Sequence, residues 1–409
     1  MKNKKDILFL CQFFYPEYVS SATLPYDTAV AIAQAGFSVD ALCGYPKEYS
    51  IGHSIPKEEI NKNIHIKRLK YIQLKRSSFI GRLINYFSFA LSVILKIGIL
   101  RGYKIVIVYS NPPILPIIAT IANKLFHTKV VFVCYDVYPE IALATNTISK
   151  SGFISRMMKF GNKIIFKNVK KVVALSDEMK NFLEKNRLQL SNDRINVIPN
   201  WYEDKSYTMR ENNSSIFKEI NGKDDFLVSY FGNMGTCQDI STIVNAMRSL
   251  KDKKKIKFLF AGHGNKMDEL KKIVENERLK NVKIFDFLHG EQFDEALKIS
   301  DCFIVSLAEG LTGLCVPSKI YSYMMAGSPI IAIMDKDSDI VGELKEYNYG
   351  YSMQVGEDLK LVKAIETLYF NTDKRKLMGK NCRKVFLEKY TKEICTQKYV
   401  DMMKEILEG

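Results

Sequence analysis

The feature that most constrains the fold of this chain is the alternation of short apolar runs with helix-like stretches along its whole length. Runs such as 104–109 (KIVIVY) and 129–134 (KVVFVC) are short and almost wholly apolar, which is typical of strands buried on both faces of a sheet. Stretches such as 24–35 place apolar residues at helical spacing instead. Strands that alternate with helices pair in parallel, so this pattern predicts doubly wound α/β domains.

The same alternation of strands and helices continues through both halves of the chain. Strands are predicted at 6–11, 38–43, 64–69, 104–109, 129–134, 171–175, 195–198, 226–231, 257–261, 282–285, 302–306 and 330–333. Helices are predicted at 24–35, after Pro113 to about 126, from Ser176 with Glu178 onward, at 240–249, 266–277, 292–298, 319–326, 359–371 and, interrupted at Tyr390 and Thr391, 374–407. A chain of 409 residues accommodates two or three domains, and the polar stretch 201–225 is the best linker candidate. We therefore predict two Rossmann-like domains, 1–200 and 201–409.

Charge is distributed unevenly between these two halves. Residues 1–200 contain 28 Lys and Arg against 13 Asp and Glu, whereas residues 201–409 contain 32 of each. A basic half with apolar segments is suited to an anionic membrane or a phosphorylated substrate. No nucleic-acid-binding motif accompanies the charge, so we expect no nucleic-acid partner. General solubility is the plain alternative explanation for the excess of lysine.

One apolar segment, 79–100, has three possible interpretations. It is long enough to span a membrane, but polar and basic residues recur in it at near-helical spacing and no second span follows. It could instead be a helix packed within the domain, or a helix lying on a membrane surface. The surface interpretation is favoured by the basic residues that precede the segment, Lys67, Arg68, Lys70, Lys75 and Arg76.

Cysteine and histidine usage argues against a metal or redox centre. No two of the eight cysteines lie within three positions of each other, and the five histidines form no HxxxH or HExxH pattern. We expect buried, reduced thiols, no protein-bound metal and no cofactor. The short apolar run after the basic N-terminus reads as a strand and not a signal peptide, so a cytoplasmic location is expected.

Glycine and small residues follow several predicted strands, at the positions where parallel sheets bind ligands. The small residues 20–23 precede a helix N-terminus, which favours a phosphate, although an ordinary capped loop explains them as well. Glycines also flank the turns 232–235 and 262–264, where backbone N–H groups could face an anion. A lone GxxG is weak evidence, and His263 is more often a turn residue than a catalyst.

The most informative run is 306–329, SLAEGLTGLCVPSKIYSYMMAGSP. It follows a strand and leads into a short helix, with Glu309 and Lys319 flanking a loop of small residues. A lysine at a helix N-terminus suits a diphosphate, and a nearby carboxylate can bind sugar hydroxyls. In the first half, Asp136 and Glu140 follow a strand and could bind an acceptor or act as a base, or could simply be acids at a helix start.

Together these residues resemble the retaining family 4 glycosyltransferases, which have the type B fold of two Rossmann-like domains facing each other across a cleft. The matching pieces occur in order over nearly the whole chain. They are Tyr15-Pro16-Glu17, Asn111-Pro112-Pro113, Asp136-Val137-Tyr138-Pro139-Glu140, Ala174-Leu175-Ser176, Ile198-Pro199-Asn200-Trp201, Gly232-Asn233-Met234-Gly235 with Gln238-Asp239, Ala261-Gly262-His263-Gly264, Pro317-Ser318-Lys319 and Ala326-Gly327-Ser328-Pro329. This fold type also implies that the C-terminal helix returns to the first domain.

The resemblance implies metal-independent transfer from a nucleotide sugar, most simply a UDP-sugar, held by the second domain. The acceptor would be a polyprenyl-diphosphate-linked saccharide bound by the first domain at the inner face of the cell membrane, in bacterial surface-polysaccharide assembly. The expected catalytic residues are Asp136, Glu309 and Lys319, and the expected acceptor contacts are Tyr15, Glu17 and Glu140. The expected donor contacts are Ser21, Gly232, Asn233, Met234, Gly235, Gln238, Gly262, His263, Gly264, His289, Gly310, Pro317, Ser318 and Ser322.

Some positions depart from the family pattern. Asn233 and Gln238 stand where many members carry Arg and Lys, and Pro317 or Ser322 stands where a second glutamate is usual. The diphosphate would then be held by Lys319 and by the backbone of the loop 232–235. Two alternatives remain open at this point: a nucleotide-sugar epimerase on the same fold, and a non-catalytic subunit that keeps only the fold.

Overall fold

The computed structural model describes residues 4–46, 55–74, 79–205, 216–220, 222 and 224–408. It divides into two compact units. Unit 1 consists of Met1–Asn200, Gly313–Val316 and Lys392–Gly409, and unit 2 of Trp201–Thr312 and Pro317–Thr391. Part of the expected linker, including Asn212 to Ser215, lies outside the described residues, as do Lys75 and Arg76.

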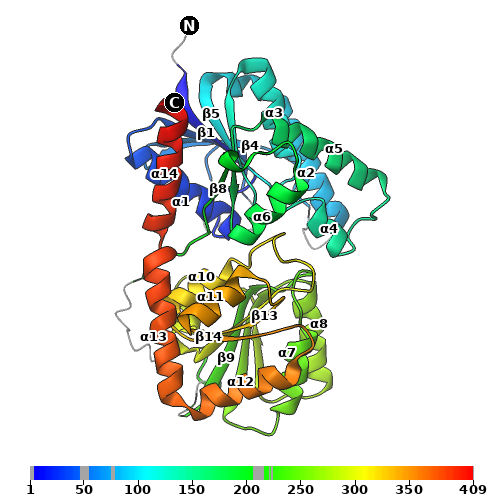
Figure 1. The fold of residues 1–409 in the computed structure, drawn as a ribbon, viewed down its shortest axis with the longest axis vertical. Coiled ribbons are helices and arrows are strands. Elements are labelled where there is room, and N and C mark those ends of the chain that lie inside the picture. Colours follow the sequence, from blue (N-terminus) through cyan, green and yellow to red (C-terminus); the bar gives the residue numbers. More distant parts are fainter. Residues whose placement is uncertain are drawn as a thin grey trace. The chain divides into compact units, whose positions relative to one another are not determined.

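Unit 1 is built on an eight-stranded sheet of order β3-β4-β2-β1-β5-β6-β7-β8 (Figure 1). Its strands are β1 Lys5–Cys11, β2 Val39–Gly44, β3 Glu58–Asn61, β4 Ile64–Leu69, β5 Tyr103–Tyr109, β6 Lys129–Val133, β7 Lys171–Ala174 and β8 Ile195–Val197. All neighbouring strands pair in parallel except β3, which is antiparallel to β4. The central strands β1 and β5 are almost wholly buried, as expected for a sheet with helices on both faces.

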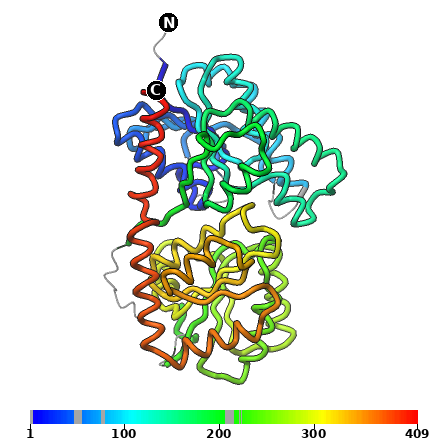
Figure 2. The backbone as a smooth tube through the Cα atoms, in the orientation of Figure 1, coloured from blue at the N-terminus to red at the C-terminus, as the bar shows by residue number. Residues whose placement is uncertain are grey.

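The helices of unit 1 connect and cover these strands. They are α1 Ser20–Gln34, α2 Phe79–Ile94, η1 Ile97–Gly102, α3 Leu115–Phe126, α4 Glu140–Ala144, α5 Phe153–Asn168, α6 Asp177–Asn186, η2 Asn192–Arg194 and α14 Lys392–Glu408. The C-terminal helix α14 packs against α1, at the opposite end of the sequence (Figure 2). The expected return of the last helix to the first domain is thus confirmed, so the segment Lys392–Gly409 belongs to unit 1 and not to the second domain.

Unit 2 repeats the architecture with a six-stranded parallel sheet of order β11-β10-β9-β12-β13-β14. Its strands are β9 Phe226–Asn233, β10 Ile256–His263, β11 Val282–Phe285, β12 Cys302–Ser306, β13 Ile330–Ile333 and β14 Gly350–Met353. Its helices are α7 Ser241–Ser249, α8 Asn265–Asn276, α9 Gly290–Ile299, α10 Lys319–Ala326, α11 Asp339–Tyr347, α12 Asp358–Phe370 and α13 Thr372–Lys389. The two predicted Rossmann-like domains are therefore both present.

The structure corrects two expectations about helices. Helix α1 begins at Ser20, so the small residues 20–23 form its first turn and are not a loop before it. The segment 79–100 is divided between α2, which ends at Ile94, and η1. No helix within the described residues combines the length and apolarity needed to cross a bilayer, which removes the spanning interpretation of this segment.

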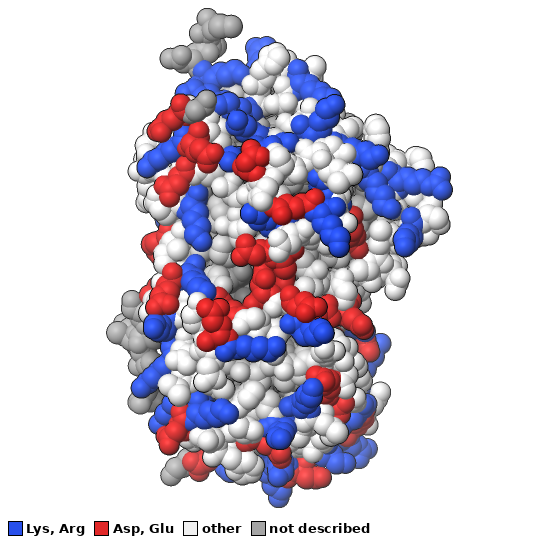
Figure 3. Space-filling view, viewed as in Figure 1, with Lys and Arg blue, Asp and Glu red and all other residues white. Residues whose placement is uncertain are grey.

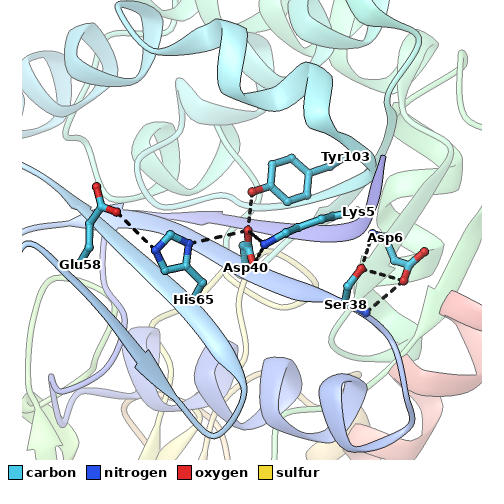
Figure 4. Close-up of polar contacts among 7 residues, drawn as sticks. All are labelled: Lys5, Asp6, Ser38, Asp40, Glu58, His65 and Tyr103. Carbon is cyan, nitrogen blue, oxygen red and sulfur yellow. Dashed lines mark hydrogen bonds and ion pairs between the residues drawn. The ribbon is translucent and has the colours of Figure 1, made fainter. Parts of the chain in front are cut away.

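The amino ends of the strands in unit 1 are joined by a polar cluster (Figure 4). The carboxylate of Asp40 on β2 accepts hydrogen bonds from Lys5 (2.8 Å) and from the hydroxyl of Tyr103 (2.7 Å). His65 on β4 lies between Asp40 and Glu58, with its ring nitrogens 3.9 and 3.4 Å from their carboxylates. These contacts link the five neighbouring strands β3, β4, β2, β1 and β5. They lie away from the carboxyl ends of the parallel strands, where such sheets bind ligands, so we assign this cluster a structural role.

Candidate active site

In unit 2, two glycine turns pack backbone against backbone at the carboxyl ends of β9 and β10. Gly262 lies directly beside Gly232 in the ladder. A Cβ atom on Gly262 would lie 2.0 Å from the carbonyl oxygen of Gly232, and one on Gly264 would lie 2.4 Å from that of Met234. Gly232, Gly262 and Gly264 also have positive φ angles. Side chains are therefore disfavoured by conformation at all three positions, and excluded by contact as well at Gly262 and Gly264.

Two backbone N–H groups of the turn 232–235 donate hydrogen bonds to other atoms of the protein. The N–H of Met234 donates to the carbonyl of His263 (2.8 Å). The N–H of Gly235 donates to Oε1 of Gln238 (2.7 Å). Both groups therefore already have acceptors, and the diphosphate contact expected of them requires these bonds to break. Gln238, at a position where a cation was expected, closes the turn instead.

Lys319 is the first residue of α10, and its ammonium group lies against the end of β9. Nζ donates to the carbonyl of Asn233 (3.0 Å) and to the hydroxyl of Tyr230, and it lies 3.8 Å from the centre of the Tyr230 ring. Burial lowers the pKa of Lys319 to about 7. Among the described residues no carboxylate forms an ion pair with it. A half-buried cation without a carboxylate partner is suited to an anionic ligand such as a diphosphate.

The loop after β12 carries Glu309, whose side chain is exposed. The loop is anchored by Asp335, which follows β13. Its Oδ2 atom accepts hydrogen bonds from the N–H of Gly310 (3.2 Å) and from the hydroxyl of Thr312 (2.9 Å). The N–H of Ala308 donates to the carbonyl of Cys237 (2.8 Å), so the Glu309 loop is also bonded to the segment directly after the glycine turn. Asp335 was not identified from the sequence because it lies 25 residues beyond the glycine that it contacts.

Other expected donor residues in unit 2 lie at the same edge of the sheet with differing exposure. His263 ends β10 and is exposed beside Phe287, with ring centres 5.6 Å apart. His289 is exposed at the start of α9. Pro317 and Ser318 precede α10. Ser322 is buried and its hydroxyl donates to the carbonyl of Lys319 (2.8 Å) within the helix, so it supports the helix where a second glutamate was expected.

Two buried tyrosines position this edge and were not identified from the sequence. The hydroxyl of Tyr323, on α10, accepts from the N–H of Phe231 (2.7 Å) and donates to its carbonyl (3.1 Å). The hydroxyl of Tyr230 donates to the carbonyl of Asn233 (3.1 Å). Together they fix the end of β9 against α10, and therefore the place of Lys319 relative to the glycine turn.

In unit 1, Asp136 follows β6 in a short irregular segment. The backbone N–H groups of Tyr135 and Asp136 both donate to the hydroxyl of Ser110, at 3.0 and 3.2 Å. The next residue, Val137, donates to the carbonyl of Leu314 (2.8 Å), in the segment Gly313–Val316 that belongs to this unit. Asp136 also lines a small cavity, of about 20 Å³, with Ser110 and with residues on the inner face of α5. Burial raises the pKa of Asp136 to about 6, so it can exchange a proton near neutrality.

Glu140, the first residue of α4, forms a bidentate ion pair with Arg187. Its carboxylate oxygens lie 3.0 and 2.6 Å from the guanidinium nitrogens of Arg187, whose side chain is almost buried. Arg187 also donates to the carbonyl of Tyr138 (3.3 Å). Breaking such a pair would leave a buried charge, so this carboxylate has a structural task whether or not it binds an acceptor.

The other expected residues of unit 1 follow β1. The Tyr15 ring stacks on Tyr26, with centres 5.0 Å apart, and its carbonyl accepts from the buried Arg68 (2.8 Å). Glu17 is buried. Ser21 lies in the first turn of α1, in unit 1, whereas the other expected donor residues all belong to unit 2.

Two protein families match this chain. Residues 22–205 match Glycosyltransferase Family 4, and residues 211–385 match Glycosyl transferases group 1. The chain belongs to the family 4 glycosyltransferases. The probable glycosyltransferase WbjE of Pseudomonas aeruginosa is 27% identical to it over 324 residues, which cover 78% of this chain and 79% of that protein.

Solved structures show the same fold as this glycosyltransferase at low sequence identity. Anabaena Alr3699/HepE, crystallised with UDP and glucose, aligns with a TM-score of 0.72 and 14% identity over 98% of this chain and 100% of its own. WaaG, a glycosyltransferase involved in lipopolysaccharide biosynthesis, aligns with a TM-score of 0.65 and 14% identity over 97% and 99% of the two chains. The enzyme therefore has the type B fold.

Proposed function

We propose that this glycosyltransferase transfers a sugar from a UDP-sugar, with retained anomeric configuration, to a polyprenyl-diphosphate-linked saccharide. The product would contribute to a capsule, O-antigen or exopolysaccharide. The donor nucleotide is supported by the structural likeness to HepE, which was crystallised with UDP and glucose. The pathway is supported by the likeness to WaaG, which is involved in lipopolysaccharide biosynthesis.

The single observation that carries the donor assignment is Lys319. It is a half-buried ammonium group at a helix start, beside the glycine turns, and within the described parts of the chain its hydrogen bonds go to neutral oxygens. A diphosphate placed there gains a charge-assisted partner and restores the ordinary preference of the lysine for its charged form. In the transition state Lys319 would neutralise the departing diphosphate, which is the task that a metal ion performs in other transferases.

The remaining roles follow from position. Glu309 would bind hydroxyl groups of the donor sugar from its exposed place on the anchored loop. Asp136 would face the acceptor from unit 1, where its raised pKa suits hydrogen bonding with a hydroxyl that loses its proton. The donor phosphate itself would take that proton, so no residue of this chain is assigned as a nucleophile. An acceptor linked to a lipid would keep the enzyme at the inner face of the membrane.

Thermal unfolding with UDP, GDP, ADP and CMP, each at millimolar concentration with EDTA present, tests this proposal. A nucleotide that binds only the folded state stabilises it by about 2.7 kcal/mol at a hundredfold excess over Kd. We expect a selective increase in Tm with UDP. An increase with another nucleotide alone would change the donor, and no increase with any of the four would contradict the assignment of Lys319.

A further inference from the structure

Helix α5 is apolar on two opposite faces. Its inner face packs into unit 1 through buried residues such as Ile165 and Phe166. Its outer face carries Phe153, Met157 and Phe160, with exposed fractions of 75, 57 and 66%. These three positions recur at i, i+4 and i+7, so they form one stripe along the helix. A surface helix normally needs only one apolar face, so the outer stripe is not explained by the core.

Helix α2 repeats this arrangement on the same side of the unit. Its exposed residues Ile80, Phe87 and Leu91 also share one face, with exposed fractions of 67, 60 and 56%. Helix α3 contacts both α2 and α5, and it exposes Ile121 and Leu125. In the part of the chain that the structure describes, eleven of the twenty exposed large apolar residues lie on these three helices or directly after α2. We call the outer sides of α2, α3 and α5 the apolar–basic surface.

The charge around this surface has one sign. Residues 79–176 contain 13 Lys and Arg but only two acids: Asp136 lines the cavity beside the inner face of α5, and Glu140 is paired with Arg187. On α5 itself no acid is present, and four basic residues lie along one side of the apolar stripe: Arg156, Lys159, Lys163 and Lys167. Figure 3 shows this part of unit 1 as mostly Lys, Arg and uncharged residues. This accounts for most of the net charge of +15 of the whole chain.

We propose that the apolar–basic surface docks this enzyme onto an anionic lipid bilayer, with the outer face of α5 inserted among the headgroups. Large apolar side chains beside lysine and arginine, without acids, are typical of helices that lie in a membrane interface. A protein partner fits less well, since lysine is depleted in protein interfaces. The expectation from sequence assigned membrane contact to the basic first half in general and named 79–100 as a candidate surface helix, whereas the structure adds α5, which no sequence pattern had singled out.

The inner face of α5 contributes to the cavity that contains Asp136, the proposed acceptor-side residue. Asn162, Ile165 and Phe166 line the pocket that also contains Asp136. Because one helix contributes both to the docking surface and to this pocket, a docked enzyme holds the Asp136 pocket about one helix diameter, roughly 10 Å, from the headgroups. This step rests on the proposed lipid-linked acceptor, whose saccharide would reach the segment that carries Asp136 while its lipid stays in the bilayer.

The test is co-sedimentation of the full chain with vesicles of phosphatidylcholine, with and without phosphatidylglycerol. We expect association with the anionic vesicles only, weakened by high salt. The variant Phe153→Ser/Phe160→Ser should reduce association on the order of tenfold or more, because it removes the aromatic part of the stripe. The matched control Leu359→Ser/Leu377→Ser removes residues of unit 2 with exposed fractions of 76 and 53%, and should bind like the wild type.

Each result decides the proposal. The proposal is overturned if wild-type protein does not bind anionic vesicles. It is also overturned if the Phe153→Ser/Phe160→Ser variant binds them as well as wild type does. Self-association that this variant abolishes, without vesicle binding, would assign the surface to a second copy of the chain. The Tm increase with UDP, measured on the same samples, separates the two proposals: vesicle binding without a UDP effect refutes the donor and leaves the surface standing.

A fluorescence measurement gives an independent readout of insertion. The chain has one tryptophan, Trp201, which is buried. Phe153→Trp therefore adds a single exposed reporter on the outer face of α5. We expect a blue shift and quenching by brominated lipid in anionic vesicles, with no such change for Leu359→Trp. Unquenched emission from the Phe153→Trp variant while bound to vesicles would show that α5 does not enter the bilayer.

Discussion

The two units share one sheet architecture but use the carboxyl ends of their strands differently. In unit 2 the ends of β9 and β10 are glycine turns in backbone contact, beside Lys319, whose hydrogen bonds among the residues that the structure describes go to a carbonyl and a hydroxyl. In unit 1 the corresponding edge presents side chains, among them Asp136 with its raised pKa and the ion pair of Glu140 with Arg187. Unit 2 thus offers backbone and a cation, whereas unit 1 offers carboxylates and a pocket.

This difference matches the two proposed substrates. A nucleotide diphosphate has the same shape in every donor, so close backbone approach and one fixed cation suffice to hold it. Acceptors differ in their hydroxyl groups, and hydroxyl groups are distinguished by side-chain hydrogen bonds. Substitutions in unit 2 should therefore affect stability and donor use, and those in unit 1 should affect the acceptor.

The largest effect is expected from Gly262→Ala in the backbone contact of unit 2. The new Cβ atom would lie 2.0 Å from a carbonyl oxygen, at a φ of +148°. We expect a loss of about 4 kcal/mol in the free energy of unfolding, measured by urea denaturation, because the turn must move as a whole. Gly342→Ala, in α11 with no atom within 4 Å of the added Cβ, should instead be neutral or stabilise by about 0.5–1 kcal/mol. Equal stability of the two variants would show that the turns are not held by close contact.

The next largest effect is expected from Lys319→Ala. It should lower kcat/KM by roughly a hundredfold, about 3 kcal/mol of transition-state stabilisation, and abolish the Tm increase with UDP. Because the pKa of Lys319 is about 7, wild-type enzyme should also take up a proton when UDP binds at pH 8, as measured by calorimetry in buffers of different ionisation enthalpy. Lys266→Ala, a nearby lysine paired with Glu269, is the control. Unchanged turnover of Lys319→Ala would remove the proposed donor site.

An intermediate effect is expected from Asp136→Asn, and here activity and stability should move in opposite directions. Acceptor kcat/KM should fall roughly 10- to 100-fold, with the UDP effect on Tm unchanged. The pKa of Asp136 is raised in the folded state, so its carboxyl favours folding while protonated and this contribution is lost as pH rises through about 6. The Tm advantage of the Asn variant should therefore be larger at pH 8 than at pH 4.5. A lost UDP effect would place Asp136 on the donor side.

Much of the fold could be predicted because the spacing of apolar residues and the residues that cap helices are visible in short stretches of sequence. The interval 319–326 predicted from sequence has the bounds of α10, and Ser176 caps α6 through its hydroxyl, as its position before Asp177 and Glu178 indicates. Helix α5 escaped notice because its apolar residues lie on two faces, which blurs the 3.6-residue period. The start of α1 was placed late because Ser20 to Thr23 are small residues that suit a loop equally well.

The candidate site was predictable in its location but not in its contacts. The rule that ligands bind at the carboxyl ends of parallel strands indicated the glycine turns, Lys319 and Asp136. The residues that position them lie far away along the chain: Tyr230 is 89 residues from Lys319, and Ser110 is 26 from Asp136. Such pairs depend on sheet order, which a single sequence does not reveal. The turn-closing role of Gln238 depends on the direction of its side chain and could not be predicted either.

The smallest effect, and the sharpest test of the comparison, is expected from Asp335→Asn. Asparagine keeps the shape and can still accept from Gly310 and Thr312, but without the charge each hydrogen bond is weaker, by about 1 kcal/mol in total. The loop that carries Glu309 would loosen while the acceptor side is untouched. KM for the donor should rise roughly three- to tenfold, with acceptor KM unchanged, in initial-rate measurements with both substrates varied. If acceptor KM rises instead, Glu309 belongs to the acceptor and the division of tasks between the two units is reversed. Asp335→Ala, which removes both bonds, should then exaggerate whichever KM has changed.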